Sequence, residues 1–333
     1  MPRSAFFCLL ACLVFAAVGS AWAEPVPVIF DTDMDTDCDD AGALAVLHAL
    51  ADLGEVEILA TVVSSRFRWS VPCTAAINRY HGRPDLPLGA PKGPGPNTGN
   101  RGSKYAREIS EQFPGKPATN DNAEDAVAVY RRLLAARESA DVVIVSVGYV
   151  TNLDALLSSE ADDISPLTGP ELIRRGVKHW VCMGGRYPNH LDPAVYGNFK
   201  PDPAAAVRAA RDWPTTVYFT GLGNDVHTGS RLPETPKENP VRIIYERYVG
   251  AGKTRPSWDP IAVLFAARPT DPAWSVHTGG HNHIFENGTN EWREGEATHH
   301  RRIDFAGEGE MKESKAAVKK TLDELMIRPP GKQ

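Results

Sequence analysis

Cysteine is scarce in this sequence of 333 residues, and its five cysteines do not form the pattern of a disulfide-rich fold. Only Cys38, Cys73 and Cys182 follow residue 23, an odd number spread over a long chain. Blocks of basic residues and internal repeats are missing, and no apolar run reaches the length of about 18 residues that a membrane-spanning helix needs. These absences argue against a disulfide framework, a nucleic-acid partner and a membrane-spanning protein.

The first 23 residues have the features of a secretory signal peptide. Arg3 supplies the positive amino-terminal region, residues 5–18 form the apolar core, and Ala21-Trp22-Ala23 is a small-x-small cleavage site. Cleavage after Ala23 removes one of the 36 basic residues and none of the 42 acidic residues, so the net charge changes from −6 to −7. The sequence therefore predicts an exported protein, periplasmic or extracellular, with a single domain over residues 24–333.

Apolar runs typical of buried strands alternate with helical patterns along this domain. The expected strands are residues 26–30, 57–63, 141–147, 177–183 and 215–220, and the expected helices are residues 41–53, 71–80, 122–137, 154–157, 203–211 and 311–326. This alternation is typical of an α/β fold with an open, mostly parallel, Rossmann-like sheet flanked by helices. The active site of such a fold is expected at the carboxyl ends of the strands.

Six carboxylates lie within ten residues directly after the first expected strand. They are Asp31, Asp33, Asp35, Asp37, Asp39 and Asp40. Repulsion among so many carboxylates would raise their pKa values and cost folding energy unless a cation neutralised them. Helix capping would explain only the last two. The loop therefore predicts a site for a hard divalent cation, Ca²⁺ or Mg²⁺.

Two known kinds of metal loop match this string poorly. It fails as an EF-hand because Thr36 stands where glycine is needed and Gly42 where glutamate is needed. Paired aspartates after a strand are also typical of Mg²⁺-dependent phosphatases with an aspartate nucleophile. Those enzymes have Thr or Val four residues after the first aspartate, where this chain has Asp35 or Asp37. The phosphatase nevertheless remains an alternative.

A third pattern, Asp31-Thr32-Asp33 followed by Asp39-Asp40-Ala41, resembles the inosine-uridine preferring nucleoside hydrolase family. Further segments resemble this family in the expected order; they are Gly148 to Asn152, Met183-Gly184-Gly185, Asn198 with Asp202-Pro203, and Trp258-Asp259-Pro260. The resemblance covers most of the mature chain. It implies cleavage of ribonucleosides into base and ribose, with a Ca²⁺-bound water activated by an aspartate.

The resemblance also implies roles for individual residues. Asp33 would be the general base and a metal ligand, with Asp40, the carbonyl of Val147 and Asp259 as the other protein ligands of Ca²⁺. Asp39 and Asn198 would bind the ribose. Read without the resemblance, Asp259 and Asp202 would start helices, and Thr151 or Asn152 would cap one. Given the resemblance, we still expect Asp202, and Thr151 or Asn152, to cap helices. We expect Asp259, however, to bind the metal.

The chain departs from the family pattern in three places. Five residues separate Asp33 from Asp39 where three are usual, which leaves Asp35 as an alternative base and allows Asp37 to join the metal. Tyr196 stands where a glutamate binds the 5′ hydroxyl, so we expect Tyr196 in the sugar pocket. Trp258 replaces a histidine that helps the base to leave; because indole can only donate a hydrogen bond, we expect it to stack on the base instead.

Because Trp258 cannot protonate the leaving base, two questions about the function stay open. His190, His227 or Tyr196 could protonate the leaving base, and a non-catalytic Ca²⁺-dependent binder of sugars or nucleosides remains an alternative to the enzyme. The expected partner is a small molecule, a nucleoside or a related riboside, with neither nucleic acid nor membrane. A homo-oligomer is compatible with the sequence.

Overall fold

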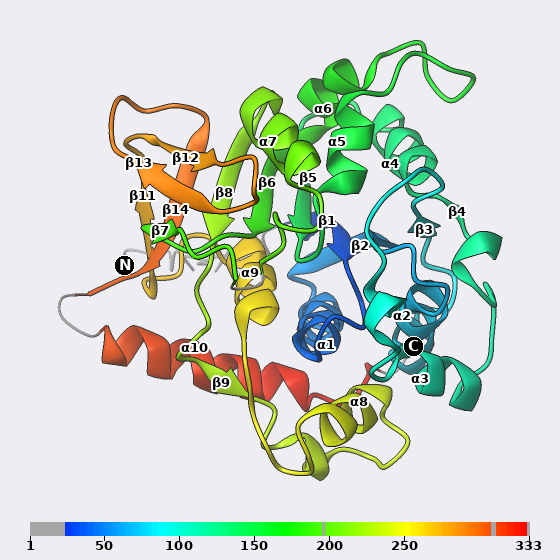
Figure 1. Ribbon diagram of the computed structural model, residues 1–333. Helices are drawn as coiled ribbons and strands as arrows, with labels where there is room; N and C mark the ends of the chain where they lie inside the picture. The colour runs from blue at the N-terminus through cyan, green and yellow to red at the C-terminus, as the bar shows by residue number, and fades with distance from the viewer. Residues whose placement is uncertain (1–23, 195–196, 308–310, 332–333) are drawn as a thin grey trace, which may run out of the picture.

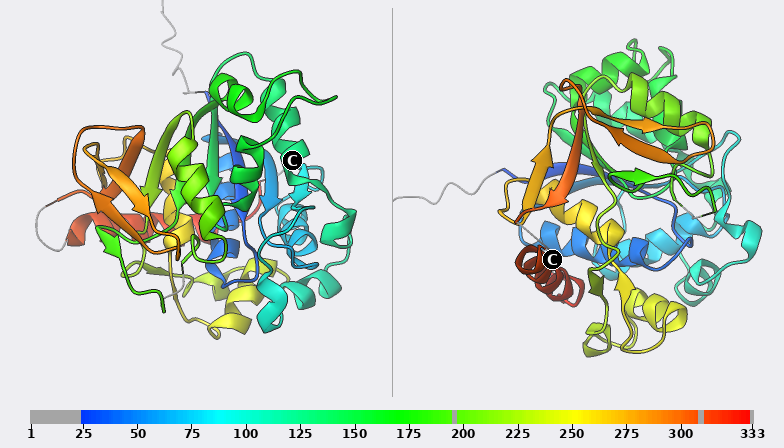
Figure 2. Two further views of the ribbon diagram at one scale, coloured as in Figure 1. Left: turned by 45° about the horizontal axis from the view of Figure 1, so that its top comes forward. Right: turned by 60° about the vertical axis from the view of Figure 1, so that its left-hand side comes forward.

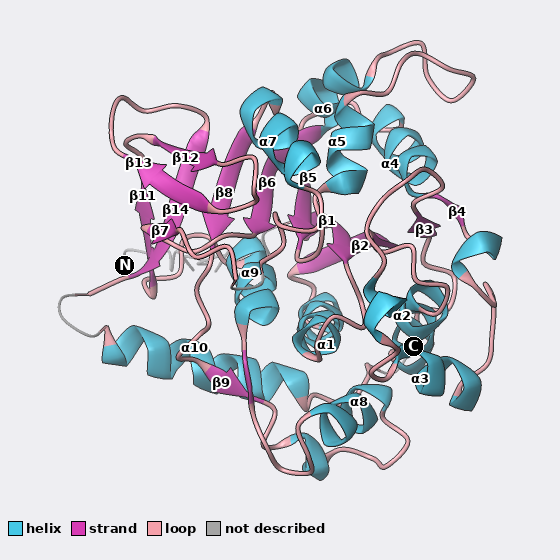
Figure 3. Ribbon diagram, viewed as in Figure 1, coloured by secondary structure: helices cyan, strands magenta, loops and turns pink. Residues whose placement is uncertain are grey.

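The computed structural model describes residues 24–194, 197–307 and 311–331. A nine-stranded sheet in the order β11-β14-β8-β6-β5-β1-β2-β3-β4 runs through the molecule (Figures 1 and 3). Only β11 and β14 pair antiparallel; the other adjacent strands are parallel. The strands are β1 (Val26–Thr32), β2 (Val56–Val63), β3 (Leu88–Ala90), β4 (Glu124–Asp125), β5 (Val142–Ser146), β6 (Val177–Met183), β8 (Thr216–Thr220), β11 (Trp274–His277) and β14 (His300–Phe305).

Helices cover both faces of this sheet, as Figures 1 and 2 show. One face carries α1 (Asp39–Asp52), α2 (Ser70–Tyr80) and α9 (Trp258–Ala267), with α3 (Ala106–Gln112), α8 (Pro240–Tyr248) and α10 (Lys312–Met326) packed outside them. The other face carries α4 (Ala126–Ala135), α5 (Thr151–Leu157), α6 (Gly169–Gly176) and α7 (Pro203–Asp212). The expected α/β fold with a mostly parallel sheet is therefore confirmed.

Several short elements complete the described chain. A second sheet in the order β12-β13-β7 is made of His281–Ile284, Asn290–Arg293 and Asn189–His190, and β9 (His227–Thr228) pairs with β10 (Arg255–Pro256). Three 3₁₀ turns are η1 (Thr98–Arg101), η2 (Asn120–Asn122) and η3 (Leu232–Glu234). Residues 84–102 contain β3 and η1. Within the described ranges, no helix is long and apolar enough to cross a membrane.

The central strands are buried on both faces because helices cover both. In β1, Val28 and Phe30 belong to the core beneath α1 and α9, whereas Ile29 belongs to the core beneath α4 and α5. Each is fully buried, which stabilises the fold by about 1.5–3 kcal/mol per side chain. The sheet thus holds β1 rigidly, and the acidic loop begins from a fixed point.

The carboxyl-terminal helix α10 packs against the helices of one face of the sheet. Its residues Val318, Leu322 and Met326 are buried, and the helix contacts α1 and α9. Met326 also approaches Gly42 of α1, where a β-carbon would stand 3.0 Å from the methionine Cε. The contact keeps α1 close to the carboxyl end of the chain.

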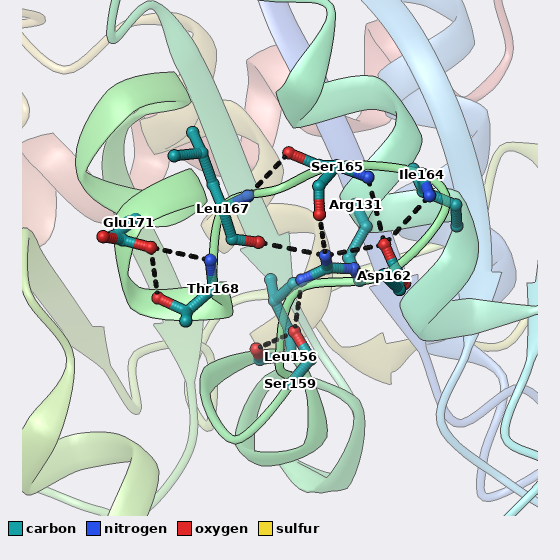
Figure 4. A network of polar contacts seen from close by, with 9 residues as sticks. All are labelled: Arg131, Leu156, Ser159, Asp162, Ile164, Ser165, Leu167, Thr168 and Glu171. Carbon is teal, nitrogen blue, oxygen red and sulfur yellow. Dashed lines mark hydrogen bonds and ion pairs between the residues drawn. The ribbon is translucent and has the colours of Figure 1, made fainter.

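A buried arginine fixes the loop between α5 and α6. Arg131 of α4 is 1% exposed and forms an ion pair with Asp162 at 2.8 Å. Its guanidinium also donates to the Ser159 hydroxyl and to the carbonyls of Ser165 and Leu167 (Figure 4). Because the buried charge has both a carboxylate and several acceptors, its desolvation is compensated. This network lies on the α4 to α6 face of the sheet and stabilises the scaffold.

Candidate active site

A pocket lies where the central parallel strands end. Asp33 follows β1, Val147 follows β5, Met183 ends β6 and Gly221 follows β8, and all four line the pocket. The chain leaves β1 toward β2 on one side and returns to β5 on the other, so the connections diverge above these strands. Such a divergence leaves a crevice at the carboxyl edge of a parallel sheet.

Two helix starts bring more carboxylates to the same pocket. α1 begins at Asp39 and α9 at Trp258, and the two helices pack side by side. Asp39, Asp40 and Asp259 therefore meet although more than two hundred residues separate α1 from α9 in the chain. The Asp259 backbone N–H donates to Asp39 Oδ2 at 3.2 Å, and the Thr32 hydroxyl donates to Asp40 Oδ1. The helix amino termini add partial positive charge that favours these carboxylates.

Burial and mutual repulsion disfavour the charges in this pocket. Burial, with a smaller contribution from the charge of Asp37, raises the pKa of Asp33 to about 7. Burial also raises the pKa values of Asp40 and Asp259 well above the usual range. The charge of Asp33 raises both of these pKa values further, and that of Asp259 adds to the pKa of Asp40. The three carboxylates thus form a cluster in which each opposes the ionisation of another.

This cluster fits a hard divalent cation by its donor chemistry. Three carboxylates and a backbone carbonyl are the oxygen donors that Ca²⁺ prefers, and a cation would relieve their repulsion. In the part of the chain that the structure describes, no three His, Cys, Asp or Glu side chains already stand in a metal-binding arrangement. The fit therefore rests on the shared pocket and on the charges of Asp33, Asp40 and Asp259.

Asp35 has a different environment from Asp33. It does not contribute to the pocket, and its carboxylate accepts the backbone N–H groups of Lys104, Tyr105 and Ala106 at 2.8–3.1 Å. Asp35 therefore caps the start of α3. Of the two aspartates considered for the base, the structure places only Asp33 at the pocket.

Asp37 is paired with an arginine that the sequence did not single out. Arg255 Nη2 lies 2.9 Å from Asp37 Oδ2, and both side chains line the pocket. Burial opposes the charge of Asp37, but a hydrogen bond from Asp39 and the Arg255 guanidinium outweigh it and lower the pKa of Asp37. Asp37 is thus neutralised by protein, and no local sequence signal links it to a residue so distant in the chain.

Asn198 joins the ends of β5 and β6. Its amide Nδ2 donates to the carbonyl of Val147 at 2.6 Å and to that of Met183 at 3.1 Å. One lone pair of the Val147 carbonyl is therefore used by protein, and the second remains for another partner. Asn198 is 8% exposed and lines the pocket.

Trp258 borders the pocket and packs against Arg255. The guanidinium carbon lies 5.0 Å from the indole centroid, a cation–π contact that occupies one face of the ring. Tyr196 lies outside the described residues. Among the described residues that line the pocket there is no histidine; His227 hydrogen-bonds to Asn224, and His190 belongs to β7.

The expectation that Thr151 or Asn152 caps α5 is wrong. Val150 is the N-cap residue and makes no side-chain cap hydrogen bond, and Asn152 donates to Asp31 Oδ2 at 3.0 Å and to the carbonyl of Val63. A buried carboxylate needs such donors, and this need outweighs the local preference for capping. Asp202 does cap α7 through the N–H of Ala205, as expected.

Glycine makes the close approach of β5 to the acidic loop possible. A β-carbon at Gly148 would stand 2.3 Å from the backbone nitrogen of Asp33 and 2.6 Å from the hydroxyl of Ser64. Gly185 after β6 has φ +76°, a conformation that favours glycine. These positions let the strand ends converge on the pocket.

Comparison with known proteins gives a family and a fold. The model of the family described as inosine-uridine preferring nucleoside hydrolase matches residues 28–323. A plant nucleoside hydrolase structure is 16% identical, with a TM-score of 0.66, and the match covers 92% of this chain and 100% of that one. No curated protein matches the sequence.

Two bacterial structures are similar to a comparable degree. The inosine-uridine preferring nucleoside hydrolase of Bacillus anthracis is 16% identical with a TM-score of 0.61, over 89% of this chain and 99% of that one. The purine-preferring ribonucleoside hydrolase of Gardnerella vaginalis is 17% identical with a TM-score of 0.61, over 90% and 99%. At these identities the structural likeness shows the fold.

Proposed function

The chain belongs to the inosine-uridine preferring nucleoside hydrolase family, and from this premise we propose that it cleaves ribonucleosides into base and ribose with the help of Ca²⁺. Membership makes it a hydrolase of N-glycosyl compounds in a metal-dependent family that acts on small nucleosides. The match gives no support to the phosphatase alternative. The observation that carries the proposal is the burial of Asp33, Asp40 and Asp259 in one pocket at the strand ends.

Asp33 is the proposed general base. Hydrolysis requires a water to lose a proton as it attacks C1′ of the ribose, and a base titrating near neutral pH suits this transfer. Burial gives Asp33 such a pKa in the protein alone. The remaining negative charge of the pocket would stabilise the oxocarbenium character of the sugar in the transition state.

The proposed Ca²⁺ ligands are Asp33, Asp40, Asp259 and the carbonyl of Val147. When bound, Ca²⁺ would lower the pKa of a coordinated water and orient the vicinal hydroxyls of the ribose. The hydrogen bond from Thr32 holds one oxygen of Asp40 and leaves the other for a ligand. Ca²⁺ rather than Mg²⁺ is proposed because several carboxylates and a carbonyl provide the larger, less regular ligand set that Ca²⁺ accepts.

Residues at the rim would hold the substrate. Asp39 and Asn198 are proposed to bind ribose hydroxyls, and the free face of Trp258 is proposed to stack on the base. Tyr196 keeps its proposed place at the sugar. Export of the mature protein after cleavage behind Ala23 also remains part of the proposal.

The proposal is tested by measuring ribose release from purine and pyrimidine nucleosides, with Ca²⁺ and with a chelator. We expect turnover only with Ca²⁺, and a loss of about 10²- to 10⁴-fold in kcat for Asp33→Asn. Asp35→Asn is the control, because its carboxylate caps α3, and it should keep kcat at a temperature where it stays folded. Binding of nucleosides without any ribose release would instead favour the non-catalytic binder.

A further inference from the structure

A second hollow adjoins the catalytic pocket and has the opposite charge. Its lining includes Thr36, Asp37 and Arg255, which also line the catalytic pocket, so the two spaces are adjacent. Lys104 and Lys200 line only the second hollow. The Asp37–Arg255 ion pair lies between the carboxylates and these lysines.

The two lysines have no carboxylate partner within the described ranges. Lys104 Nζ donates to the carbonyl of Thr36, and Lys200 Nζ donates to the carbonyl of Pro193. An ammonium has three donors, so each lysine keeps two for another acceptor. Both side chains are half-buried. Asp37, the one carboxylate among the described residues that line the hollow, already pairs with Arg255. The hollow therefore carries two uncompensated positive charges.

The lysines come from separate elements that meet only in the fold. Lys104 lies between η1 and α3, and Lys200 lies before α7. Carbonyl contacts hold both ammonium groups in place, so little side-chain freedom would be lost when an anion binds. The polar side chains of Thr98 and Asn100 also line the hollow.

We propose that this hollow, the lysine subsite, binds the phosphate group of a phosphorylated riboside, so that the preferred substrates are nucleoside 5′-monophosphates. The inference rests on the proposed function. The base is attached at C1′, and the 2′ and 3′ hydroxyls are needed by the carboxylate pocket, so the 5′ position is the one free to carry a phosphate. A phosphate with a charge of about −1.5 to −2 at pH 7 matches the two lysines.

The division of charge along the cleft supports the same substrate class. Carboxylates surround the place where the sugar becomes cationic, and lysines surround the place where an anion would sit. A neutral nucleoside would leave the lysine charges unused. A phosphorylated one would pair with them through charge-assisted hydrogen bonds.

The test compares kcat/KM for inosine, inosine 5′-monophosphate and inosine 3′-monophosphate, each with Ca²⁺. We expect the 5′-monophosphate to exceed inosine by about tenfold or more, and the 3′-monophosphate to be a poor substrate. Lys200→Ala should lower kcat/KM for the 5′-monophosphate by about 10- to 100-fold and that for inosine by less than about threefold. Lys92→Ala is the matched control, since Lys92 also donates to a backbone carbonyl but lies outside both spaces.

A binding measurement separates this inference from the catalytic proposal. Ribose 5-phosphate should raise the melting temperature more than ribose does, and Lys200→Ala should abolish the difference. If that holds while no riboside is hydrolysed, the subsite stands and the catalytic proposal falls. If inosine is hydrolysed as well as its 5′-monophosphate and Lys200→Ala changes neither, the subsite is refuted. If inorganic phosphate gives the same increase as ribose 5-phosphate and inhibits no hydrolysis, the hollow binds free phosphate and the substrate inference is refuted.

Discussion

Replacing Asp40 by asparagine should make the metal-free protein more stable and remove its response to Ca²⁺. The side chain keeps its shape, and asparagine can still accept the hydrogen bond from the Thr32 hydroxyl. What changes is the charge, which in the native protein opposes those of Asp33 and Asp259. In the metal-free protein the substitution therefore removes a repulsion between carboxylates. In the presence of Ca²⁺ it removes a ligand of the ion.

The expected size follows from the carboxylate cluster. Two like charges about 5 Å apart repel by about 3 kcal/mol at an effective dielectric constant of about 20. Protonation of part of the cluster already relieves some of this, because burial and repulsion raise the pKa values of Asp40 and Asp259. We therefore expect Asp40→Asn to stabilise the metal-free protein by about 1–3 kcal/mol, or about 2–6 °C in Tm.

Thermal unfolding with chelator and with excess Ca²⁺ measures both effects. Ca²⁺ at about 100 times its Kd should stabilise the native protein by about 2.7 kcal/mol, and Asp40→Asn should lose most of that gain. Asp35→Asn is the control because its carboxylate accepts three backbone N–H groups. It should lower the stability by about 1–3 kcal/mol in both conditions and leave the Ca²⁺ response intact. A lower Tm for Asp40→Asn in chelator, or a full Ca²⁺ response, would refute the reasoning.

Two further predictions concern the stability of the scaffold, and a third concerns the position of Asp33. Arg131→Ala should lower the free energy of unfolding, measured with urea, by about 3–5 kcal/mol, because it leaves the carboxylate and carbonyls around it without their donor. Burial lowers the pKa of His48 below its usual range and that of His81 to about 4, so stability should fall as the pH drops below about 6.5. Between pH 7 and pH 5, His81→Phe should reduce this fall by roughly 2 kcal/mol relative to native protein. Gly148→Ala should lower kcat at least about tenfold, because its β-carbon would displace Asp33; an unchanged kcat would show that the loop can yield.

Periodicity and strand ends could be read from the sequence because they are local. The five expected strands became β1, β2, β5, β6 and β8, and the acidic loop follows β1 as expected. The strands β11 and β14 at one side of the large sheet, β3 and β4 at the other side, and the small sheet of β7, β12 and β13 were not predicted. They are short or polar, and pairing with a neighbour rather than their own pattern makes them strands.

The sequence predicted which residues would meet in the pocket better than what each of them would contact. Asp33, Asp39, Asp40, Asn198 and the others described for the site do share one pocket. The sequence could not predict that Asp35 caps α3, nor that Asn152 donates a hydrogen bond to Asp31 rather than capping α5. In both cases a buried carboxylate accepts hydrogen bonds from residues 69 or more positions away.

By itself, then, the sequence determined the strand and helix pattern, the position of the acidic loop and the family, because these depend on spacings within short segments. Only the tertiary structure decided which carboxylate of the acidic loop pairs with a cationic side chain, since Asp37 pairs with Arg255, 218 residues further along the chain. It also decided that Lys104 and Lys200 lie next to the catalytic pocket. The physical reason is that charge pairing and burial depend on distance through space, which the packing of α1, α9 and the strand ends sets.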